Sequence, residues 1–150
     1  MEKDKDFLMN EIDKTRTQMK NLVEVTDFFV NASKAEGQCL PLLEFMAEGV
    51  PAIAPDHTAM SSYIDKRNAF VVGSSLVATC WPQDPREYER TFFYRIDWES
   101  LHENYLRSAQ IDSSTYEEMS FQAASLVRRQ FSVAGVAKLL SEYLRRFDLK

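Results

Sequence analysis

The first 26 residues carry apolar side chains at alternating steps of four and three, which is the spacing of one face of a helix. The positions are Leu8, Ile12, Met19 and Leu22, with Thr15 completing the steps. This pattern predicts an amphipathic helix. It spans fewer than three heptads and Thr15 interrupts it, so we expect the helix to pack on a neighbouring element and not to form a coiled coil.

Three short apolar runs follow, and each predicts a buried strand. The runs are Phe28–Val30, Val50–Ala54 and Ala69–Val72. Between them the sequence predicts a helix from about Pro41 to Glu48, ended by Gly49, and a shorter helix over roughly Ala59 to Asp65. Strands separated by short helices imply crossover connections, and therefore parallel pairing.

The stretch from Leu76 to Arg90 has no clear period. It contains Pro82 and Pro85 next to Cys80 and Trp81, so we interpret it as a loop that can include a short strand. Cys80 and Trp81 could line a ligand, although an aromatic residue beside prolines is more often a packing residue.

The last third of the chain is predicted to be helical. Asp97 can cap a helix whose apolar side carries Trp98, Leu101, Tyr105 and Ala109, with His102 as a partly buried structural residue. A second helix is predicted to start with the capping box Ser114–Glu117. Ser132 is the predicted cap of a third helix, whose apolar side is formed by Val133, Val136, Leu140, Tyr143 and Phe147.

Together these elements predict an α/β fold: a Rossmann-like short parallel sheet with flanking helices and a helical C-terminal tail. A length of 150 residues is typical of one domain. We divide it into an amphipathic leader helix (1–26), a core (27–75) and the helical tail (97–150).

Composition excludes several classes of function. Eighteen basic and 23 acidic residues give a net charge of −5, so no broad positive field is available for nucleic acid. The N-terminus reads Met-Glu-Lys-Asp-Lys-Asp and apolar runs are short, so we expect no signal peptide, no transmembrane segment and a cytoplasmic location. Two cysteines and two histidines suit a reduced compartment and match no zinc-ligand pattern, so no metal site is expected.

The stretch from Asn31 to Pro51 is the most informative, because a buried strand there passes through a glycine loop into a helix. In open parallel sheets, ligands bind at this edge. If Pro41 is the first helical residue, Leu40 occupies the cap position and offers no oxygen to the free amides of the first turn. A phosphate is a natural acceptor for these amides, and water is another.

Two acidic residues flank this loop, Glu36 at the strand end and Glu44 eight positions later. Both could face one cleft, where carboxylates suit the paired hydroxyls of a sugar and of a ribose. The alternative is that Glu44 and Glu48 form a solvated helix face and Glu36 only solubilises the loop. Spacing alone does not decide between these interpretations.

The segment Glu-Gly-Gln-Cys-Leu-Pro-Leu-Leu-Glu (36–44), followed by Met-Ala-Glu-Gly-Val-Pro (46–51), closely resembles the E-x7-E segment of family 4 glycosyltransferases of the GT-B fold. The resemblance covers roughly Leu22 to Gly73 well and the helical tail to Phe147 more loosely. It implies that the chain is part of a GT-B donor domain.

The resemblance implies a retaining, hexosyltransferase-like enzyme that uses a nucleotide sugar, a UDP- or GDP-sugar, as in polysaccharide biosynthesis. Glu36 would contact the donor sugar in the catalytic role, and Glu44 the ribose. The amides of Gly37, Gln38, Cys39, Leu40 and Leu42 would bind the donor diphosphate. Members of this family generally need no metal, and no other cofactor is implied.

Other residues near the loop are candidates too. His57 follows the second predicted strand at the same sheet edge and could hydrogen-bond a sugar or phosphate, while a structural role is the alternative. Cys39 could act as a nucleophile only beside an activating base, and the sequence places none there.

The chain also departs from the family pattern. Cys39 replaces the usual second glycine of the loop, and the expected upstream Arg and Lys are absent, with Lys34 a weak substitute. A GT-B enzyme has two Rossmann-like domains, and 150 residues are too few for both. We therefore expect the acceptor domain in a missing N-terminal part or a partner chain, and no turnover by this chain alone.

Two alternatives stay open. The chain could be a non-catalytic nucleotide-sugar-binding or partner-docking module that docks through the face from Leu8 to Leu22, or a truncated remnant with an exposed sheet edge. A peripheral association with a membrane also stays open.

Overall fold

The computed structural model describes Thr15, residues 17–88 and residues 90–147. Residues 17–24 are helical, so the predicted leader helix is confirmed over that stretch. Its predicted apolar positions Leu8 and Ile12 lie outside the described residues. Met19 and Leu22, which are described, are both exposed.

A short parallel sheet forms the centre of the fold. Its strands are β1 (Phe29–Val30), β2 (Ala52–Ala54) and β3 (Ala69–Val71), in the order β1-β2-β3. Both pairs are parallel, with Ala52 opposite Phe29 on one side and opposite Ala69 on the other. The predicted α/β class and the parallel pairing are therefore confirmed.

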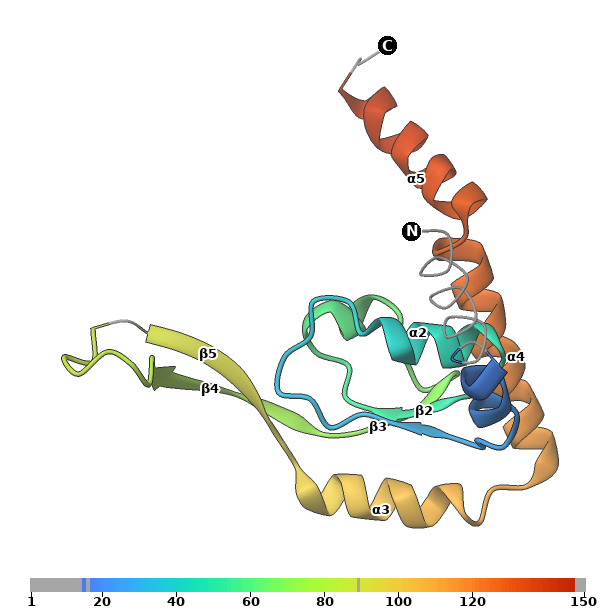
Figure 1. Cartoon of the computed structure of the whole chain (residues 1–150), viewed down its shortest axis with the longest axis horizontal. Coiled ribbons are helices and arrows are strands. Elements are labelled where there is room, and N and C mark those ends of the chain that lie inside the picture. Colours follow the sequence, from blue (N-terminus) through green and yellow to red (C-terminus); the bar gives the residue numbers. More distant parts are fainter. Residues whose placement is uncertain (1–14, 16, 89, 148–150) are drawn as a thin grey trace, which may run out of the picture.

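Helices cover both faces of this sheet (Figure 1). On one face lie α2 (Leu40–Ala47) and α4 (Ser113–Gln130), joined to the sheet by a core that includes Leu42, Met46 and Leu126. On the other face lies α3 (Trp98–Ser108), whose Leu101 packs with Ile53 and Val72. These residues come from both the strand runs and the late helices, so the sheet is closed by elements distant in sequence.

Gly49 ends α2, as predicted, and also allows the helices to approach closely. Its φ of 87° lies in the left-handed region that favours glycine. A Cβ added there would lie only 2.8 Å from Ser120 Oγ of α4. The packing of α2 against α4 therefore depends on a residue without a side chain.

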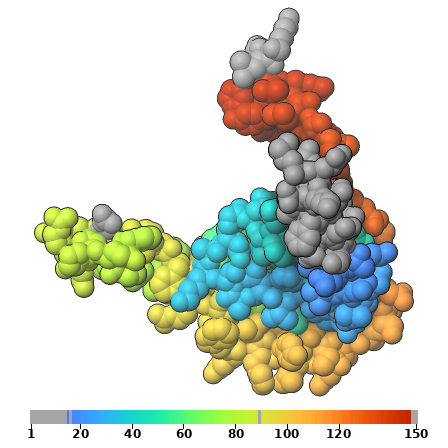
Figure 2. Space-filling view, in the orientation of Figure 1, coloured from blue at the N-terminus to red at the C-terminus, as the bar shows by residue number. Residues whose placement is uncertain are grey.

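The stretch from Leu76 to Arg90 was predicted to be a loop that can include a short strand, and it holds a strand up to Cys80 and then a turn. The sequence pattern missed the second strand and the pairing of the two. Strands β4 (Ser74–Cys80) and β5 (Arg90–Ile96) form an antiparallel hairpin that pairs Ser74 with Ile96 and Cys80 with Arg90. The hairpin extends away from the body (Figures 1 and 2). Because an extended ribbon has little core to face, its residues lack the alternation by which a half-buried strand is predicted, and the prolines lie in the turn.

The start of α3 and its Asp97 cap are confirmed. The Asp97 carboxylate accepts hydrogen bonds from the amides of Glu99 and Ser100. On the predicted apolar side Leu101 packs against the sheet, and Trp98, Tyr105 and Ala109 are exposed. The buried residue is Asn104, whose amide donates to the Val71 carbonyl at 3.0 Å. His102 is exposed and not partly buried as predicted.

The last two helices begin with side-chain caps, one of them not the predicted one. The carboxylate of Asp112 accepts from the Thr115 amide, so α4 starts before the predicted Ser114–Glu117 box. Helix α5 (Val133–Arg146) is capped by Ser132, as predicted. Its apolar side is exposed. Among the described helices, none combines the length and apolar character needed to cross a membrane.

Candidate functional site

An open groove of about 790 Å³ lies where β1 ends and α2 begins. This is the carboxyl edge of the parallel sheet, where ligands bind in open α/β folds. The predicted residues Glu36, Gln38, Cys39 and Leu40 all line the groove. Other lining residues come from β1 and its loop: Phe29, Val30, Asn31, Ala32, Ser33 and Pro41.

Helix α2 begins at Leu40, one residue earlier than predicted, and Cys39 is its N-cap. The structure corrects the boundary, but the expected lack of a capping oxygen is confirmed, because no side chain caps the helix. In the described part of the chain, no acceptor contacts the amides of Gly37, Gln38, Cys39 or Leu40. Three of these free backbone donors belong to residues that line the groove, and the fourth belongs to Gly37, which is not among the lining residues. A helix start favours an anion at this position.

Glu36 is half-buried and is held by three hydrogen bonds. Its carboxylate accepts from the Ser33 hydroxyl at 2.5 Å, and its amide donates to Thr58 Oγ1 at 3.1 Å. Its carbonyl accepts from the Ala59 amide at 3.4 Å. Thr58 and Ala59 belong to a short 3₁₀ helix, Thr58–Ser62, which replaces the longer helix predicted there. The loop carrying Glu36 is therefore fixed by the segment after β2.

Cys39 adopts φ 56° and ψ 62°, a left-handed conformation that favours glycine. The side-chain amide of Asn31 donates to its sulfur at 3.0 Å. Burial raises the pKa of the Cys39 thiol, an effect that the Leu42 amide partly offsets and the charge of Glu36 reinforces. The thiol is therefore neutral near pH 7, which disfavours a nucleophilic role.

His57 lies behind the Glu36 loop and does not line the groove. Only 4% of the residue is exposed, and its ring stacks on Tyr94 with centroids 4.2 Å apart. Nδ1 lies 3.4 Å from Thr58 Oγ1, and Nε2 is buried without a hydrogen-bond partner. Burial lowers the pKa of His57. In this structure His57 supports the loop through Thr58 and does not reach the predicted ligand position.

The hairpin also holds the loop. The Tyr94 amide donates to the Lys34 carbonyl at 2.9 Å, and Lys34 Nζ lies 5.0 Å from the centre of the Phe93 ring. Lys34, considered above only as a weak substitute for the absent upstream Arg and Lys, is not among the groove residues. From the other side, the Tyr63 hydroxyl donates to the Gln38 carbonyl at 2.7 Å.

Other predicted residues stand apart from the groove. Leu42 is fully buried in the core, so only its backbone could serve a ligand. Glu44 is exposed on α2 and does not line the groove, and Glu48 is exposed near the helix end. Cys80 and Trp81 lie at the far end of the hairpin. Of the predicted pair, Glu36 lines the groove and Glu44 does not.

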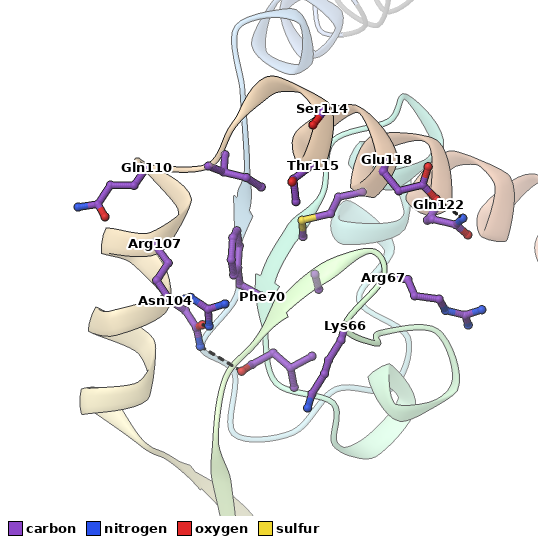
Figure 3. Close-up of a pocket in the computed structure, with 14 residues that line it drawn as sticks. Lys66, Arg67, Phe70, Asn104, Arg107, Gln110, Ser114, Thr115, Glu118 and Gln122 are labelled. Carbon is purple, nitrogen blue, oxygen red and sulfur yellow. Dashed lines mark hydrogen bonds between the residues drawn. The ribbon is translucent and has the colours of Figure 1, made fainter.

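A second cavity, of about 880 Å³, lies between β3, α3 and α4 (Figure 3). None of the predicted site residues lines it. Two of its three basic side chains are engaged locally: Arg107 lies over the Phe70 ring, and Arg67 points outward and pairs with Asp65. No sequence motif marks this cavity, because its lining comes from β3, α3, α4 and the loops beside them.

Within the described residues, no group of three or more His, Cys, Asp or Glu side chains is placed to hold a metal ion. Comparisons of the chain with protein-family models, curated proteins and solved structures give no match.

Proposed function

We propose that this chain binds a nucleotide sugar as the donor-binding part of a glycosyltransferase. The observation that carries the proposal is the uncapped start of α2, which leaves free the amides of three groove residues, Gln38, Cys39 and Leu40, and of the adjacent Gly37, at the carboxyl edge of a parallel sheet. Free amides and the helix dipole suit a diphosphate. The sequence resemblance at Glu36–Glu44 supplies the class of ligand.

Each part of the donor has a proposed contact. The amides of residues 37–40 bind the diphosphate, and Glu36 at the groove wall orients the sugar and stabilises positive charge that develops on it during transfer. Glu44 lies one turn along α2 from these amides and binds the ribose hydroxyls from outside the groove. Transfer itself requires an acceptor site that excludes water, which we assign to another domain or chain.

The lack of a basic side chain among the groove residues favours an alternative to a transferase donor domain. In this alternative the chain is a module that binds nucleotide sugars without catalysis. Glu36 is the only charged residue among those that line the groove, and Lys34 is turned to Phe93. A diphosphate would be held by backbone dipoles without a basic side chain, so we expect weak binding. The same titrations test both forms of the proposal, because each requires the donor to bind.

The first experiment titrates the full chain with UDP and with GDP by calorimetry or NMR. We expect saturable binding that Glu44→Ala weakens about tenfold or more, because a loss of about 1.4 kcal/mol corresponds to a factor of ten. Glu48→Ala is the matched control, since Glu48 is also exposed at this helix but lies a turn further on. An equal loss in both variants would remove Glu44 from the site.

Glu36→Gln separates the sugar from the nucleotide. This variant should bind the nucleoside diphosphate almost normally and lose affinity for the complete nucleotide sugar. An equal loss for both ligands would contradict the role of Glu36. A folded chain that binds no nucleotide at millimolar concentrations would overturn the proposed function.

A further inference from the structure

Helix α5 is a helix without a core. It has 14 residues, Val133–Arg146, and none of them is buried. It extends from the end of α4 away from the body (Figures 1 and 2). Helices of this length are marginal in water on their own and gain most of their stability by packing an apolar face. The apolar face of α5 would therefore gain stability by packing against a partner.

The apolar face of α5 is wide. At about 100° per residue, its large apolar side chains cover an arc of about 140°. Leu139 and Leu144 lie at the two edges of this arc and are also apolar. A two-stranded coiled coil usually has charged residues at such edge positions. The stripe consists of Val133, Val136, Leu139, Leu140, Tyr143 and Leu144, continued by Phe147, with exposed fractions from 36% to 89%.

The charge of this region is opposite to that of the chain. Between residues 128 and 147 there are five basic residues and one acidic residue, a net charge of +4, although the chain as a whole carries −5. All six charged side chains are exposed. They are Arg128, Arg129, Lys138, Glu142, Arg145 and Arg146. The surface of α5, which no described residue covers, is thus both apolar and basic.

We propose that α5 binds an anionic lipid surface as an amphipathic helix lying in the membrane interface. A strongly amphipathic helix with Leu, Phe and Tyr on one side and basic residues on the other is typical of this binding mode. The basic residues contact lipid phosphates, and the long stem of Arg146 lets its charge reach the headgroups from the edge of the stripe. A parallel pair of α5 helices from two copies fits less well, because it would bring the identical basic ends, Arg145 and Arg146, together.

The test is co-sedimentation of the full chain with vesicles of phosphatidylcholine alone or mixed with phosphatidylglycerol. We expect the chain to bind the mixed vesicles. Leu140→Glu should weaken this binding at least about tenfold, because it removes a leucine that inserts into the lipid and adds a negative charge. Phe92→Glu is the matched control: it makes the same charge change at an exposed apolar residue of the hairpin. This control should bind nearly as the parent does.

Charge is tested by a second pair of variants. The double variant Arg145→Gln and Arg146→Gln should partition about thirtyfold more weakly, since each basic residue near an anionic surface contributes about fivefold. The control removes two hairpin arginines, Arg90→Gln and Arg95→Gln, and so changes the net charge equally. If both double variants lost binding to the same extent, the overall charge of the chain and not α5 would direct the association. That result would overturn the proposal.

Two further outcomes overturn it. One is the absence of binding to mixed vesicles by a folded chain, checked by circular dichroism. The other is a concentration-dependent dimer in analytical ultracentrifugation that Leu140→Glu abolishes. Such a dimer would cover the apolar stripe of α5 without lipid. Neither result depends on nucleotide binding, so the test is independent of the proposed donor site.

Discussion

Helices α2 and α5 are opposites in how they are stabilised. In α2, Leu42, Leu43, Phe45 and Met46 are buried, and no side chain caps its start. In α5 no residue is buried, and Ser132 caps the first turn. Tertiary packing therefore holds α2 in spite of its unfavourable start, whereas α5 has a favourable start and no buried residue. The free amides of α2 can be left for a ligand because its core supplies the stability.

The largest expected effect tests burial. Leu42→Ala should lower the free energy of unfolding by about 2–5 kcal/mol, because it leaves a cavity in the core. Leu140→Ala, the same change on α5, should cost no more than about 0.5 kcal/mol, since Leu140 is exposed. Urea unfolding measures both. A large cost for Leu140→Ala would mean that α5 is packed in solution, which would remove the contrast.

The next effect tests the backbone at the start of α2. Cys39→Val should lower the free energy of unfolding by about 1–2 kcal/mol, because a β-branched residue is strained at φ 56°. Cys39→Gly should stay within about 1 kcal/mol of the parent, since relief of strain offsets the entropy of a more flexible unfolded chain. Thermal unfolding of the two variants would show it. Equal costs would indicate that the sulfur contact with Asn31 matters more than the conformation.

The cap of α5 should have a smaller effect that stays local. Ser132→Ala removes the acceptor of the Gly135 amide and should destabilise this helix by about 1 kcal/mol. Because α5 contributes no buried residue, helical circular dichroism should fall while the main unfolding transition stays in place. A shift of the main transition would show that α5 and the body unfold together.

The smallest effect concerns pH and the support of the α2 loop. Burial lowers the pKa of His57, so the unfolded chain binds more protons once the pH falls below the ordinary value of about 6.5. The contribution of His57 to stability should be constant above pH 7 and decrease from pH 6.5 downward. His57→Gln should flatten this slope between pH 7 and 5, measured by urea unfolding. His102→Gln, at an exposed position on α3, is the control and should retain it.

The position of the groove and the missing cap of α2 could be predicted from local chemistry. The placement of Glu36 and His57 depends on tertiary contacts. The groove sits where the strand, the loop and Pro41 placed it, and the missing cap was visible because Leu40 and Cys39 offer no oxygen to the helix start. The position of Glu36 could not be derived from its own segment, because Thr58 and Ala59 hold it from beyond β2. The placement of His57 behind the loop follows from Tyr94, on a hairpin that the sequence pattern did not predict.

The sequence pattern predicted the parallel pairing of three short strands, the helix end just before Gly49 and the caps at Asp97 and Ser132. The pairing follows from the short crossover segments between the strands, and the helix end and the caps depend on residues a few positions apart. Which apolar faces are buried depends instead on tertiary contacts. Helices α2 and α5 both carry apolar residues at helical spacing, yet α2 packs against the sheet and α4, whereas α5 meets only the end of α4 and has no buried residue. Burial is a property of two surfaces, and a local pattern describes only one of them.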